Sequence, residues 1–143
     1  MADERGPVAR ARLHPVHAFL LAGCVPLFLG ALLSDWAYSS TYEIQWTNFA
    51  SWLLVGALVL AGLALLWALV DLLRADRGWR GRSLIYVLVL LAAWVVGFIN
   101  ALVHAKDAWA KMPEALILSV IVAILVLAAC WLGLSTWRSG EVK

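Results

Sequence analysis

Three histidines and a few carboxylates are the residues of this chain that could do chemistry. His14 and His17 lie one turn apart in HPVH, before a long apolar run, and His104 follows a later run. Imidazole is a common ligand of metals and haem iron, and it titrates near neutral pH. Ligation, proton handling and ordinary packing are therefore the interpretations to weigh for these side chains.

Ligation of one haem or metal ion by a single chain is disfavoured by the positions of the histidines. His14 and His17 lie at the beginning of the first apolar run, whereas His104 lies at the end of the third. If these runs cross a bilayer, about 30 Å separates the two levels, too far for one iron atom to bridge. A haem b shared by two copies of the chain stays open. No metal site is expected, because no HExxH, CxxC or carboxylate cluster supplies three or four ligands.

Two histidine–aspartate pairs are predicted instead, one at each end of the apolar runs. His17 and Asp71 are expected at the same depth in the membrane. Asp35, His104 and Asn100 are expected together at the opposite side. Such pairs suit proton handling, because histidine titrates near neutrality. They also suit interhelical packing contacts, which we favour because the runs contain no carboxylate or histidine between the two levels. The candidate functional polar residues are His14, His17, Asp71, Asp35, Asn100 and His104.

Other catalytic constellations are absent from the sequence. It contains no nucleophile beside a base, no glycine-rich phosphate loop and no paired catalytic carboxylates. The two cysteines, Cys24 and Cys130, fall inside apolar runs, where thiols usually serve as small packing residues. We therefore predict that the chain is not an enzyme.

The elements that carry these residues are predicted to be membrane spans. The chain has 143 residues, of which 64% are hydrophobic and 14% charged, and its mean hydropathy is +0.89. A span needs about 20 apolar residues, and the runs at about 16–35, 49–73, 83–105 and 114–137 qualify. We therefore predict that residues 1–143 form a single all-α domain, made of these four spans, in a lipid bilayer. A net charge of +2 gives no indication of nucleic-acid binding.

Small residues at spacings of three and four mark a packing face on each span. In 49–73 this face contains four alanines and continues to Asp71, and in 83–105 it contains Asn100 and His104. The intramembrane polar residues fall on these faces, so all are expected to point into the bundle, where a bilayer penalises them least. Short connections predict an up-down-up-down four-helix bundle. Its longest connection is expected at 36–48.

Basic residues predict that both termini are cytoplasmic. Nine of the 11 lysines and arginines fall before the first span, between the second and third spans, or in the tail. The other two connections contain only Lys106 and Lys111. Cytoplasmic loops carry an excess of lysine and arginine, which gives this orientation.

Three stretches resemble an uncharacterised bacterial membrane family that is catalogued only as a domain of unknown function. They are HPVHAFLLAGCVPLFLGALLSD, WTNFASWLLVGALVLAGLALLWALVDL and CWLGLSTWRSGEV. Family members share an opening HPxHP, an aspartate ending each of the first two spans, and a closing WLGG-x-L-x-Y-x-HGV. The matched positions are His14, Pro15, His17, Pro26, Asp35, Asp71, Trp131, Leu132 and Gly133. The departures from the pattern are Ala18, Leu134 and Ser139, the last replacing a histidine.

The resemblance implies a four-span protein of the bacterial inner membrane with no established activity. Relatives are often companions of secreted quinoprotein dehydrogenases and other periplasmic redox proteins. Our leading hypothesis is therefore an accessory or anchoring subunit for a partner, such as a periplasmic redox enzyme. A small proton-coupled transporter or channel is the alternative, and it would need a homo-oligomer because four spans enclose little volume. A b-type cytochrome formed by two copies is the third hypothesis.

Overall fold

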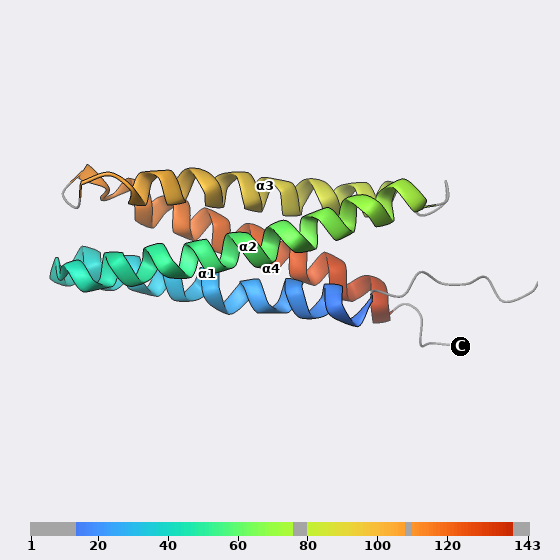
Figure 1. Ribbon diagram of the computed structural model, residues 1–143, viewed down its shortest axis with the longest axis horizontal. Helices are drawn as coiled ribbons and strands as arrows, with labels where there is room; N and C mark the ends of the chain where they lie inside the picture. Colours follow the sequence, from blue (N-terminus) through green and yellow to red (C-terminus); the bar gives the residue numbers. More distant parts are fainter. Residues whose placement is uncertain (1–13, 76–79, 108–109, 139–143) are drawn as a thin grey trace, which may run out of the picture.

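Four long helices make up the computed structural model, which describes residues 14–75, 80–107 and 110–138 (Figure 1). They are α1 (Pro15–Thr41), α2 (Ile44–Arg74), α3 (Arg80–His104) and α4 (Glu114–Arg138). All four are long and apolar enough to cross a membrane, and no strand occurs in the described ranges. The all-α four-span prediction is therefore confirmed. Arg5, Arg10, Arg12, Arg77, Ser139 and Lys143 lie outside the described residues.

The helices form a bundle in which consecutive helices run in opposite directions (Figure 1). Helix α1 packs against α2 and α4, and α3 packs against the same two helices, so α1 and α3 are diagonal partners. The α1–α2 and α3–α4 connections lie at one end, which we call the Asp35 end. The beginnings of α1 and α3 lie at the other end, which we call the His17 end.

The predicted connection at 36–48 is wrong, because most of this stretch is helical. Helix α1 continues to Thr41 and α2 begins at Ile44, which leaves only Tyr42 and Glu43 between them. The hydroxyl groups of residues 39–41 donate hydrogen bonds to backbone carbonyls about one turn earlier, at distances of 2.7–3.0 Å. Tyr42 then ends the helix in a left-handed conformation (φ 55°), and its N–H donates to the Tyr38 carbonyl. The helix thus continues past its apolar run, through a stretch whose hydroxyl groups bond to the helix's own backbone.

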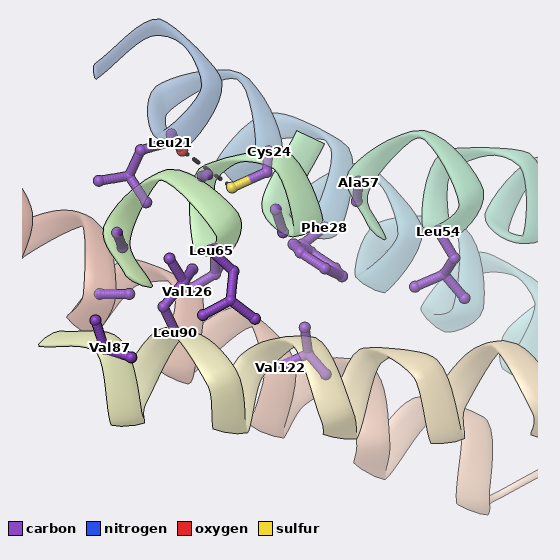
Figure 2. Packing of buried hydrophobic residues seen from close by; sticks show 14 of the residues in the cluster. Leu21, Cys24, Phe28, Leu54, Ala57, Leu65, Val87, Leu90, Val122 and Val126 are labelled. Carbon is purple, nitrogen blue, oxygen red and sulfur yellow. Dashed lines mark hydrogen bonds between the residues drawn. The ribbon is translucent and has the colours of Figure 1, made fainter. Parts of the chain in front are cut away.

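Apolar side chains fill the middle of the bundle (Figure 2). The predicted alanine face of α2 is buried, with Ala57, Ala61, Ala64 and Ala68 at most 3% exposed. Small residues let helix backbones approach closely where lipid supplies no hydrophobic drive for association. Larger side chains fill the space between the helices. They include Leu21, Phe28, Leu54, Leu90, Val122 and Val126, all fully buried.

Two glycines mark close approaches between helices. A Cβ at Gly133 of α4 would lie 2.7 Å from Leu21 Cδ2 and 3.2 Å from the Tyr86 ring. A Cβ at Gly62 of α2 would lie 3.1 Å from Trp94 Nε1. The Trp94 indole N–H donates a 3.1 Å hydrogen bond to the carbonyl of Leu58. Each glycine therefore leaves space that a neighbouring helix uses.

Candidate functional site

A polar cluster at the Asp35 end brings together three of the predicted residues. His104 Nε2 lies 2.7 Å from Asp35 Oδ1, joining the diagonal helices α1 and α3. Asp35 is 0% exposed and His104 is 6% exposed, although both lie on helices long enough to span a membrane. The predicted contact between Asp35 and His104 is therefore present.

The second carboxylate oxygen of Asp35 is also occupied. Ser119 of α4 donates to Asp35 Oδ2 at 2.5 Å, and Asn100 Nδ2 donates to Ser119 Oγ at 2.7 Å. Both Ser119 and Asn100 are buried. Three helices therefore meet at one carboxyl group, with Asn100 acting through the serine instead of touching Asp35.

The hydrogen-bond pattern fixes how many protons the Asp35–His104 pair holds. His104 Nδ1 lies 2.9 Å from the backbone carbonyl of Asn100, which can only accept, so Nδ1 carries a proton. A second proton must lie between Nε2 and the carboxyl group, on one partner or the other. Either the pair is imidazolium and carboxylate, or both groups are neutral. In both cases it carries no net charge, which reduces the penalty for placing it at membrane depth.

Lys111 closes the cluster from the α3–α4 connection. Its Nζ donates to Thr47 Oγ1 of α2 and to the carbonyl of His104, both at 3.0 Å. That carbonyl belongs to the last turn of α3, where backbone acceptors lack helical partners and a cation is favourable. Lys111 is 5% exposed. Burial lowers its pKa below the usual 10.5, while the carboxylates of Asp35 and Asp107 oppose this shift.

The cluster contains serine, histidine and aspartate, but their arrangement differs from that of a nucleophilic triad. In a triad, histidine takes the serine proton and the carboxylate orients the histidine. Here Ser119 donates to the carboxylate, and both nitrogens of His104 face other acceptors. No imidazole nitrogen is left to activate the hydroxyl group. All three side chains are also buried, so a substrate has no access to them.

The His17 end has a smaller polar contact than predicted. His17 is 1% exposed, and its Nε2 lies 2.7 Å from the hydroxyl group of Tyr86 on α3. Its Nδ1 is buried without a hydrogen-bond partner. The predicted pairing of His17 with Asp71 is wrong, because one ring nitrogen of His17 contacts Tyr86 and the other has no hydrogen-bond partner among the described residues.

Asp71 does not point into the bundle, contrary to the prediction from the alanine face. Its side chain is exposed, whereas Ala68 one turn earlier is buried. A pattern of period 3.5 drifts by about 20° per heptad on a straight helix, so two heptads after Ala57 the face has turned by about 40°. This drift moves Asp71 out of the packed face and towards the surface.

His14 is an exposed helix cap. Its Nδ1 accepts a 3.3 Å hydrogen bond from the Val16 N–H at the beginning of α1. Its ring lies 4.9 Å, centroid to centroid, from the indole of Trp67 on α2. His14 and Trp67 line a surface groove of about 600 Å³ that also includes Asp71 and Arg74. The first histidine of HPVH therefore belongs to the surface and the second to the interior.

Sequence reasoning missed Thr47, Lys111 and Tyr86 as members of the polar contacts. Thr47 did have a signal, because it continues the spacing of three and four from Ala57 towards the beginning of α2. Lys111 follows no helical period, since it lies in a connection. Tyr86 also had a signal, because it continues the spacing of three and four from His104 and Ala93 towards the beginning of α3.

Metal ligation receives no support from the part of the chain that the structure describes. No group of three or more histidine, cysteine, aspartate or glutamate side chains comes together there. Cys24 and Cys130 are free thiols, and Cys24 Sγ donates to the Leu21 carbonyl at 3.0 Å. His17 and His104 lie at opposite ends of the bundle and contact different partners. One chain alone therefore cannot place both around one haem iron.

Comparison with known families decides where the chain belongs. A family model described as "Predicted membrane protein (DUF2231)" matches residues 13–142. The chain belongs to the DUF2231 family. The match confirms the resemblance to an uncharacterised membrane family, and the four apolar helices agree with a multi-pass DUF2231 membrane protein. Searches of the curated proteins and of the solved structures found no match to the chain.

Proposed function

We propose that this DUF2231 chain is a non-catalytic accessory subunit of the bacterial inner membrane that anchors or assists a periplasmic redox enzyme. The observation that carries the proposal is the use of the buried polar groups at the Asp35 end. Both oxygens of Asp35 and both nitrogens of His104 contact other groups of the bundle. A site whose aspartate and histidine are both fully engaged holds helices together, and only the buried Asn100 Oδ1 of its side chains is left without a partner among the described residues.

The apolar middle of the bundle supports the same proposal. Among the described residues, the buried histidines, carboxylate, amide and ammonium all lie at the two ends. Between them lie fully buried apolar side chains such as Leu21, Phe28 and Leu90. A proton or polar solute would need polar groups along its route, and the buried polar side chains of the described residues lie only at the two ends. This favours anchoring over transport.

The Asp35 end carries exposed aromatic side chains that suit a partner. Trp36, Trp46 and Trp52 are 63%, 42% and 78% exposed. Large aromatic side chains are enriched in protein interfaces as well as at the headgroup level of membranes. With both termini cytoplasmic, as the basic residues indicate, this end faces the periplasm. A periplasmic enzyme would then dock over it.

Affinity purification with matched variants tests this proposal. A tagged chain is purified from membranes in mild detergent, alongside Trp36→Ala/Trp52→Ala and the control Trp131→Ala. Trp131 is 73% exposed but lies on the last turns of α4, near the His17 end. We expect a stoichiometric partner with the unchanged chain and the control, and its loss from the double variant. The absence of any stoichiometric partner, together with normal growth of a deletion strain on respiratory substrates, would contradict the proposal.

A small proton-coupled transporter or channel is the second candidate because Asp35 and His104 share a proton inside the bundle. Proton flux into liposomes containing the purified chain tests it directly, with His17→Ala, Asp35→Asn and Asp71→Asn as variants. The accessory role predicts no flux above that of empty liposomes. Flux that Asp35→Asn abolishes would replace the accessory role with the transport role.

A further inference from the structure

The groove at the His17 end lies outside the hydrogen-bonded contacts at the two ends of the bundle, although the ring contact of His14 with Trp67 forms part of its wall. It lies beside the beginning of α1 and the last turns of α2, and it measures about 600 Å³. This falls within the roughly 300–1,000 Å³ of sites that bind small molecules. Its α2 residues run from Leu63 to Arg74, so it follows the outer side of that helix for about three turns.

The groove changes from apolar to polar along its length. Leu63, Leu66 and Val70 line it towards the middle of the bundle and are 48%, 62% and 43% exposed. His14 and Arg74 line the other part, near the ends of their helices. A phospholipid has the same order, with its hydrocarbon chains followed by its polar headgroup.

The depth of the groove agrees with this order. Helix α2 has 31 residues, which span about 46 Å, whereas the hydrocarbon core of a bilayer is about 30 Å thick. The last turn of α2 therefore reaches the headgroup level. Trp67 lines the groove one turn before Asp71, and indoles favour this boundary between hydrocarbon and headgroups.

The charged side chains in the groove indicate which lipid headgroup would bind there. Asp71 and Arg74 are both exposed, and no ion pair joins them within the described residues. A guanidinium group suits a phosphate, and a carboxylate suits a primary ammonium group. The beginning of α1 adds a positive helix end and the end of α2 a negative one. Both signs of charge are therefore available, as a zwitterionic headgroup requires.

We propose that this groove binds one phosphatidylethanolamine molecule, with its phosphate on Arg74 and His14 and its ammonium group on Asp71. The acyl chains lie over Leu63, Leu66 and Val70. Asp71 decides the specificity. An anionic lipid without an ammonium group is repelled by it, and a trimethylated headgroup cannot donate hydrogen bonds to it. This assignment also gives a role to an aspartate that the bundle interior does not use.

Native mass spectrometry of the purified full chain tests the proposal. The chain is mixed with equal amounts of phosphatidylethanolamine, phosphatidylcholine or phosphatidylglycerol of identical acyl chains, and bound lipid is counted. We expect about three- to fivefold more phosphatidylethanolamine than phosphatidylcholine, the effect of one hydrogen bond from the ammonium group to Asp71 worth up to about 1 kcal/mol. Asp71→Asn should reduce this preference to about one, and Asp71→Glu should keep it.

The controls separate the groove from general lipid contact. Glu43→Gln removes an exposed carboxylate at the opposite end of the bundle and should leave the preference unchanged. Arg74→Gln should weaken binding of all three phospholipids. Circular dichroism checks that each variant keeps its helices, which is expected because the substituted side chains are exposed. Equal binding of the three lipids by the unchanged chain, or a preference that survives Asp71→Asn, would overturn the proposal.

Discussion

His17 and Asp35 lie on the same face of α1, 18 residues apart. At about 3.6 residues per turn this is five turns, or about 27 Å along the helix. Their partners on α3, Tyr86 and His104, are also 18 residues apart. Two polar contacts thus join the diagonal helices at both ends of an apolar core. A shift of α3 along α1 by one residue would break both, so together they fix how these helices align.

The first prediction concerns the Asp35 carboxyl group. We expect Asp35→Ala to lower the free energy of unfolding by about 3 kcal/mol, because it leaves His104 Nε2 and the Ser119 hydroxyl group without a partner. Asp35→Asn should cost only about 1 kcal/mol, since an amide can donate to a neutral imidazole and accept from the serine. Denaturation in detergent micelles, followed by circular dichroism, measures both. An Asn variant no more stable than the Ala variant would show that the polar contacts do not hold this end together.

The second prediction concerns pH and Lys111. Burial lowers the pKa of Lys111 from 10.5, so between its folded pKa and 10.5 the unfolded chain binds more protons than the folded one. The free energy of unfolding contributed by this group therefore rises with pH in that range and levels off above it. A neutral amine still has two N–H groups for Thr47 and His104, so its contacts survive deprotonation.

Comparison with Lys111→Met isolates this effect from other titrations. The difference in unfolding free energy between the unchanged chain and the variant should grow as pH approaches 10.5 from below. Denaturation curves at a series of alkaline pH values provide the measurement. A difference that stays constant or shrinks with pH would mean that the ammonium group is not penalised by its burial.

The third prediction concerns the close contact at Gly133. Gly133→Ala should lower the free energy of unfolding by about 1–3 kcal/mol, because the added methyl group meets the fully buried Leu21 and the Tyr86 ring. Gly81→Ala is the matched control, since a Cβ there has no neighbour within 4 Å. Alanine favours a helix over glycine, so the control should be no less stable than the unchanged chain. Equal stability of the two variants would contradict the tight packing of α4 on α1.

Periodicity predicted the parts of this structure that depend on helix faces. The alanines of α2 and the pairing of Asp35 with His104 followed from spacing and level along the spans. Asp71 did not, because the face marked by the alanines turns by about 40° over two heptads of a straight helix. Lys111 has no periodic signal because it lies in a connection. The helical stretch after Trp36 is rich in hydroxyl side chains, so hydropathy does not mark it as part of a span.

A double-mutant cycle tests the central claim that Asp35 and His104 bind each other across the bundle. Unfolding free energies are measured for the unchanged chain, Asp35→Ala, His104→Ala and the double variant. The same cycle on His17 and His104, which lie at opposite ends, is the control. We predict a coupling energy of about 1–3 kcal/mol for the first pair, and additivity within about 0.5 kcal/mol for the second. Additive effects of Asp35→Ala and His104→Ala would contradict the account.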